Sequence, residues 1–67
     1  MTMTILVNGQ PTQADDGETV ATLLAKRRLS ADKVAIEKNR RLLKSDRYGE
    51  ALKDGDEVEI VTFVGGG

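Results

Sequence analysis

The chain has 67 residues, a formal net charge of −1 and neither cysteine nor histidine. This length fits one small domain, which buries only about 60% of the surface that its unfolded chain exposes. The composition excludes disulfides, thiolate nucleophiles, the usual cysteine- and histidine-based zinc sites and a histidine general base.

The first predicted element is a β-hairpin. Residues 3–7 alternate in the manner of a strand, and Asn8-Gly9 accepts the positive φ angles of a type I′ turn. The returning strand, residues 10–14, contains Pro11, which cannot donate a ladder hydrogen bond. This strand is therefore expected at an edge of the sheet.

A short amphipathic helix is predicted next. Thr19 is a natural N-cap, and the apolar stripe that follows it has helical spacing: Val20, Leu23 and Leu24. The acids Asp15, Asp16 and Glu18 precede the helix, and residues 26–28, all basic, fill its expected last turn. Both clusters suit the helix macrodipole and need no ligand to explain them.

The second half of the chain predicts three more strands. Residues 34–38 form the third strand, Asn39-Arg40 a turn, and Leu42-Leu43 a short fourth strand. Residues 45–51 lack a clear period and are expected to hold a turn of 3₁₀- or α-helix. A final strand, rich in β-branched residues, starts at Glu57 after the turn at Asp54-Gly55.

The order ββ, α, ββ with one helix predicts an α+β, ubiquitin-like β-grasp domain over residues 1–64. Its mixed sheet would carry the helix on one face, and the first and last strands would lie side by side in the middle. The expected core consists of Ile5, Val7, Val20, Leu23, Leu24, Val34, Ile36, Leu52, Val58 and Ile60.

Residues 65–67 form a glycine tail, which we expect to be flexible because glycine has no side chain to pack and is costly to order. Gly65 and Gly66 would give the tail access to a narrow channel in another protein, and the carboxylate of Gly67 would be the reactive group. A frayed terminus or an expression scar is the plainer interpretation.

If Val58 and Ile60 point toward the helix, Val61 and Phe63 point to the open face of the sheet. Leu6 on the neighbouring strand points the same way. These three side chains would form an exposed apolar docking patch next to the tail. Alternatively, Phe63 folds over an edge of the core, or a bulge reverses the alternation.

Several segments together resemble the ThiS family, the ubiquitin-like sulfur carriers of thiamin biosynthesis. The resemblance runs from end to end and rests on Ile5 to Gly9, Glu18 to Val20 with Leu23-Leu24, Val34 to Glu37, and most specifically Leu52 to Gly67. Two features depart from the family: Asn39-Arg40 stands where Asn-Gly is common, and residues 42–45 lack an expected proline.

The resemblance implies a cosubstrate that is not itself an enzyme and binds no cofactor or metal. An adenylating enzyme similar to ubiquitin-activating enzymes would use ATP and Mg²⁺ to couple the Gly67 carboxylate to AMP. A persulfide donor of the cysteine desulfurase type would then supply sulfur for a thiocarboxylate. Thiazole synthase would use that sulfur to build the thiazole ring.

Three alternatives stay open. The chain could carry sulfur for another pathway, as the small subunit of molybdopterin synthase does. It could be a protein modifier joined through Gly67 to substrate lysines, or a plain interaction module with an inert tail.

Charge is unevenly distributed along the chain: residues 26–47 hold nine bases and three acids. A basic middle could favour an acidic partner, with Arg40 and Arg41 steering docking. Few aromatics and a pI near 5.3 argue against nucleic acid. No signal peptide or membrane-spanning run is recognisable, so a cytoplasmic location is expected.

Overall fold

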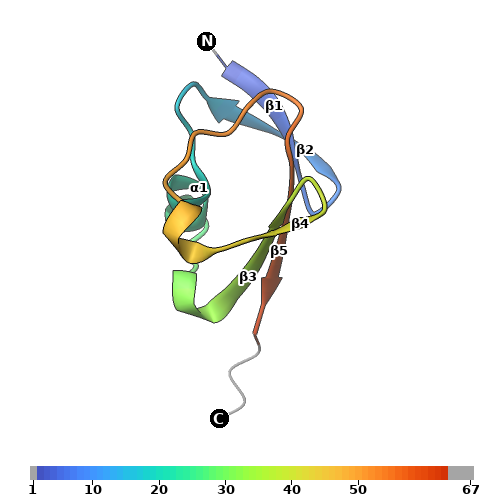
Figure 1. Ribbon diagram of the computed structural model, residues 1–67. Helices are drawn as coiled ribbons and strands as arrows, with labels where there is room; N and C mark the ends of the chain where they lie inside the picture. The colour runs from blue at the N-terminus through green and yellow to red at the C-terminus, as the bar shows by residue number, and fades with distance from the viewer. Residues whose placement is uncertain (1, 64–67) are drawn as a thin grey trace.

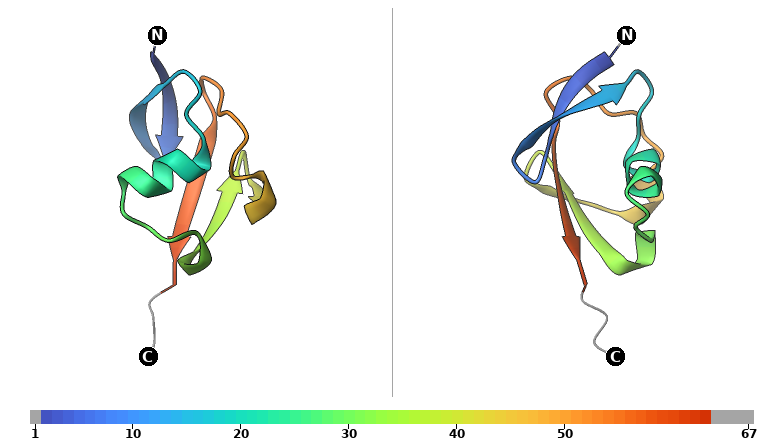
Figure 2. Two further views of the ribbon diagram at one scale, coloured as in Figure 1. Left: turned by 90° about the vertical axis from the view of Figure 1, so that its left-hand side faces the viewer. Right: turned by 180° about the vertical axis from the view of Figure 1, so that it is seen from behind.

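The computed structural model describes residues 2–63, which form a mixed five-stranded sheet with one α-helix on one face (Figure 1). Figure 2 shows that the helix and the two 3₁₀ turns lie on the same side of the sheet. This is the predicted α+β β-grasp arrangement, and the prediction is confirmed. The elements are β1 (Thr2–Val7), β2 (Gln10–Asp15), α1 (Val20–Lys26), η1 (Ala31–Lys33), β3 (Val34–Lys38), β4 (Arg41–Leu43), η2 (Ser45–Arg47) and β5 (Glu57–Thr62).

The strands lie in the order β2-β1-β5-β3-β4. β1 and β5, the first and last strands, are parallel neighbours in the middle, as predicted, and all other pairs are antiparallel. The edge position of β2 matches the constraint set by Pro11. Both hairpins turn through two residues with positive φ, Asn8-Gly9 and Asn39-Arg40, so each fits a type I′ turn.

The hydrophobic core lies between the sheet and α1. All ten predicted core residues are buried, and Ile5 and Ile36 are completely inaccessible to solvent. The structure adds four apolar residues to the predicted set: Met3, Ala14, Leu43 and Tyr48. Tyr48 belongs to the irregular segment after β4, where its backbone oxygen accepts a hydrogen bond from Ala21 N at 3.0 Å. The segment after β4 therefore lies beside α1 and shields the core from solvent on the helix side of the sheet.

The helix is capped at both ends by local hydrogen bonds. Thr19 is the N-cap, as predicted: its Oγ1 accepts from Thr22 N at 3.0 Å, and Thr22 Oγ1 accepts from Thr19 N at 2.9 Å. At the other end Arg28 has a φ of 58°, and Leu29 N donates to Leu24 O at 2.9 Å. This is a Schellman-type stop. The prediction that residues 26–28 fill the last turn is thus wrong beyond Lys26.

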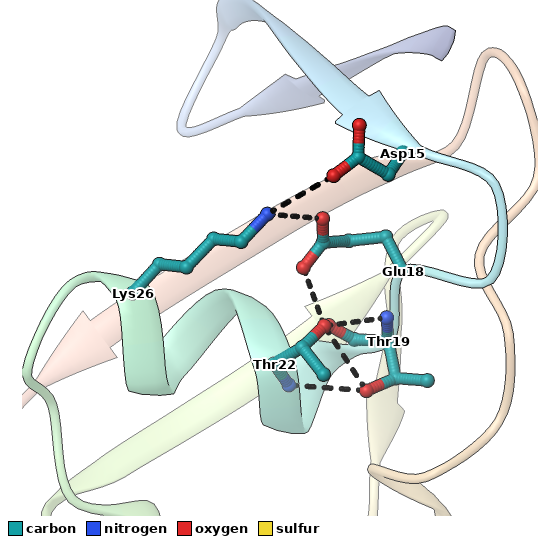
Figure 3. A network of polar contacts seen from close by, with 5 residues as sticks. All are labelled: Asp15, Glu18, Thr19, Thr22 and Lys26. Carbon is teal, nitrogen blue, oxygen red and sulfur yellow. Dashed lines mark hydrogen bonds and ion pairs between the residues drawn. The ribbon is translucent and has the colours of Figure 1, made fainter. Parts of the chain in front are cut away.

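A buried carboxylate connects the two ends of α1 (Figure 3). Glu18 is only 5% exposed, and its Oε1 lies 2.7 Å from Lys26 Nζ. Its other oxygen, Oε2, accepts a hydrogen bond from Thr22 Oγ1. Asp15 adds a longer contact, with Oδ2 at 3.8 Å from Lys26 Nζ. The hydrogen bonds from Lys26 and Thr22 favour the ionised form of Glu18, so they lower its pKa below the ordinary value, the Lys26 hydrogen bond most strongly.

We expect this network to make stability depend on acid pH. Because the pKa of Glu18 is lower in the folded chain, its contribution is fully present above the unfolded value of 4.5 and is lost as pH falls through the folded value. Glu18→Gln should cost about 1–3 kcal/mol of unfolding free energy at pH 7. As pH falls below 4.5, the unfolding free energy of the variant should decrease less steeply than that of the wild-type chain. Urea unfolding from pH 7 to pH 3 checks both expectations. Parallel pH curves for the two proteins would contradict them.

Candidate functional site

The candidate site is the C-terminal end of β5, the central strand from which the predicted tail continues. Glu57 O accepts from Asn39 N at 2.7 Å, and Phe63 N donates to Lys33 O at 2.9 Å. Glu57 and Phe63 are both odd-numbered, so the backbone N–H and C=O groups of the odd-numbered residues along β5 point toward β3. The even-numbered residues face β1, where Asp56 O accepts from Leu6 N at 2.9 Å.

Asn8 continues the β1 side of this ladder after β1 has ended. Its backbone N donates to Val58 O at 2.9 Å. Its side chain then bonds both backbone groups of Ile60: Oδ1 accepts from Ile60 N at 2.7 Å, and Nδ2 donates to Ile60 O at 3.3 Å. The side-chain amide of Asn8 thereby replaces the backbone partner that a longer β1 would supply. It holds β5 at Ile60, two residues before Thr62.

Asn39 holds the start of β5 from the other side. Its Oδ1 accepts from Glu57 N at 3.0 Å, and its Nδ2 donates to Asp56 Oδ1 at 3.0 Å. Asp56 is 9% exposed, and its Oδ2 accepts from Lys53 N at 2.8 Å. The first residue of each type I′ turn therefore binds β5 through its side chain. Together they fix the strand that leads into the predicted tail.

The reactive groups predicted from the sequence, Gly65, Gly66 and Gly67, lie outside the described residues. The last described residues before them in the sequence are Thr62, which pairs with Val34 of β3, and Phe63. Phe63 is 54% exposed, so its side chain does not fold over the core. Val61 is 56% exposed and lies on the open face of the sheet.

Leu6 lies apart from the other two residues of the predicted patch. It is half-buried and pairs with Glu57 of β5, four residues before Val61. At about 3.3 Å per strand residue this places the two side chains roughly 13 Å apart along the sheet. The structure therefore brings Val61 and Phe63 to one end of the open face and Leu6 to another part of it.

Part of the basic middle of the chain forms the β3–β4 hairpin. Arg40 lies in the turn, with Nε 3.8 Å from Glu57 Oε1, and its side chain is mostly exposed. Arg41 lines an open hollow of about 640 Å³ together with Lys38, Asn39, Leu42, Leu43, Lys44, Arg47 and Glu50. The hollow is wide, and half of its lining residues are cationic, so the structure gives it no defined ligand.

Among residues 2–63 no group of three or more acidic side chains is placed to hold a metal ion. The one α-helix in that range has seven residues, too few to cross a membrane.

Neither the two asparagine contacts nor the exposure of Leu42, which is 70% accessible, could be predicted from the sequence. An asparagine at the first position of a type I′ turn is explained by its backbone preference alone, so nothing local indicated that its side chain reaches β5. Leu42-Leu43 gave no alternation from which to choose the inward residue. A longer strand there would have supplied that signal.

Comparison with known proteins supplies a family context for this geometry. The model of the ThiS family matches residues 5–67. The sulfur carrier protein ThiS of Bacillus subtilis is 43% identical over 53 residues, which cover 78% of this chain and 80% of that protein. A crystal structure of the thiamine biosynthesis protein ThiS from Geobacter metallireducens superimposes with a TM-score of 0.75 at 36% identity, covering 97% of this chain and 100% of that one.

A thiazole synthase of Magnetococcus marinus is also similar, with 38% identity over 66 residues that cover 97% of this chain. The aligned region is only 20% of that protein. The chain thus spans about a fifth of the length of the thiazole synthases that it matches.

Proposed function

Because this chain belongs to the ThiS family, we propose that it is a sulfur carrier of thiamin biosynthesis. Gly67 would hold the sulfur as a terminal thiocarboxylate. The observation that carries the proposal is the family match, which extends through residue 67 and so includes all three glycines. In this role the chain is a cosubstrate that supplies a reactive terminus, and the catalysts are its partners.

The proposed chemistry begins with activation of the terminal carboxylate. With a pKa near 3.5 such a group is ionised at neutral pH and is a poor electrophile. In a partner adenylating enzyme, which uses ATP and Mg²⁺, the carboxylate of Gly67 would attack the α-phosphorus of ATP and release pyrophosphate. The product is an acyl-adenylate whose carbonyl carbon can accept a nucleophile. Since ATP is required, we place this step in the cytoplasm.

Sulfur would then come from a persulfide on a donor of the cysteine desulfurase type. The terminal persulfide sulfur attacks the acyl carbon and displaces AMP, and a thiol reduces the resulting acyl disulfide to release the thiocarboxylate. This chain has no cysteine, so none of these steps can use a thiol on its own side chains. Its contribution is to present Gly67 while β5 stays fixed by Asn8 and Asn39.

We propose thiazole synthase as the protein that receives the sulfur. The support is the thiazole synthases that contain a segment similar to almost the whole of this chain. A carrier-like segment within the synthase polypeptide fits a direct transfer between the two. The open face of the sheet, with Val61 and Phe63 exposed next to the tail, would provide the docking surface, and Leu6 would contribute at most its half-exposed edge.

Growth complementation tests the pathway. We expect this chain to restore growth without added thiazole in a bacterial strain that lacks its own thiamin sulfur carrier. It should not restore molybdenum-cofactor synthesis in a strain that lacks the small subunit of molybdopterin synthase. The reverse pattern would favour the molybdopterin alternative. Gly67-dependent conjugates to lysines, found instead of either rescue, would favour the protein-modifier alternative.

A further inference from the structure

The face of the sheet opposite α1 has no covering element among the described residues (Figures 1 and 2). The large apolar side chains that are exposed in this part of the chain are Leu42, Val61 and Phe63. Leu42 of β4 pairs with Glu37 of β3, and Glu37 pairs with Glu59 of β5. Leu42, Glu37 and Glu59 therefore form one row across three strands. Val61 follows Glu59 on the same face, one row nearer to the tail.

The middle of this row is an unneutralised pair of acids. Glu37 and Glu59 are directly opposite each other, and both are exposed. Their backbone groups point toward each other, so they occupy a hydrogen-bonded position of the ladder with Cα atoms about 5.5 Å apart. Like charges in such a position destabilise a sheet. Neither carboxylate has a Lys or Arg nitrogen within 4.0 Å among residues 2–63: the nearby Arg40 contacts Glu57 instead. The fold itself therefore gains nothing from this pair.

We propose that the open face binds a protein surface that places a basic side chain between Glu37 and Glu59. Apolar side chains of that surface would pack against Leu42 and Val61, with Phe63 at the C-terminal margin of the face. Charge complementarity selects this occupant, since two carboxylates with apolar neighbours would repel an acidic surface or a nucleic acid. The inference rests on the proposed function: the partner bound here is the enzyme that adenylates Gly67, and thiazole synthase would use the same face only in the later transfer step.

The test is the double variant Glu37→Gln/Glu59→Gln, compared with Asp46→Asn/Glu50→Gln. Both variants remove two negative charges from exposed positions, and the control pair lies at and just after η2, which is on the helix side of the sheet. We expect the Kd for the adenylating enzyme to rise about tenfold or more in the first variant and less than twofold in the control at low salt. The melting temperature of the first variant should stay equal or rise, because repulsion is removed.

Binding by calorimetry and loading by intact mass separate this inference from the proposed function. Equal Kd values for the two variants, or no binding of the wild-type chain, would overturn the docking inference. A lower melting temperature in Glu37→Gln/Glu59→Gln would contradict its basis in repulsion. A wild-type chain that binds but is never adenylated would contradict the proposed function, while the ratio of Kd values still decides the docking inference.

Discussion

A variant that lacks Gly66 and Gly67 is expected to fold normally and to accept no sulfur. All described core residues precede Thr62, so the deletion removes no buried apolar side chain. Two extended residues span at most about 7 Å, and the carboxylate of Gly65 would stop short of the reacting position by up to that distance. Since an error of 1 Å in placement can cost on the order of 100-fold in rate, loading should fall to background. Intact mass after reaction measures the loading, and thermal melting verifies the fold.

An extension by one alanine after Gly67 is the matched control for this deletion. It keeps all three glycines and a free carboxylate, but it moves that carboxylate by about 3.5 Å. The extended variant should also fail to load and should melt like the wild-type chain. Loading of the deletion variant at the wild-type rate would show that Gly67 is not the reacting residue.

The substitution Ile36→Ala is expected to cause the largest loss of stability. Ile36 is fully buried, and it pairs with Ile60 of β5 and Leu43 of β4. Truncation to alanine at such a site costs about 2–5 kcal/mol, while a domain of this size has on the order of 5 kcal/mol in total. For a loss near 3 kcal/mol, the melting temperature should fall by roughly 12–24 °C.

Leu42→Ala provides the control for that substitution, because it removes as many carbon atoms from a side chain that is 70% exposed. Its effect on unfolding free energy should stay within about 0.5 kcal/mol. Thermal and urea unfolding of both variants gives the comparison. If the two variants lost similar stability, the assignment of Leu42 to the open face and Ile36 to the core would be wrong.

The fold could be predicted from the sequence because its signals are local. Asn8-Gly9 fixes a tight hairpin, Pro11 restricts β2 to an edge, and the alternation around Val58 and Ile60 identifies the buried face of β5. The end of α1 could not be predicted, because three consecutive basic residues suit a helix and Arg28 occupies a position where glycine is usual. Tyr48 was missed because its burial depends on packing against the helix, which residues 45–51 do not encode locally.

The candidate site was predictable only where it depends on alternation. The exposure of Val61 and Phe63 follows from which way Val58 and Ile60 point. The distance between Leu6 and Val61 depends on the register of β1 against β5, and the opposition of Glu37 and Glu59 depends on that of β3 against β5. A strand pattern with a period of two residues determines the face of a side chain but not its neighbour on the next strand.

The measurement that tests the central claim most directly is the intact mass of the full chain after incubation with ATP, Mg²⁺, the adenylating enzyme and a persulfide donor. The proposed function predicts a mass increase equal to the replacement of one oxygen by sulfur, dependent on ATP and absent when Gly67 is removed. An unchanged mass in a reaction where the same enzyme and donor load a known ThiS protein would contradict it.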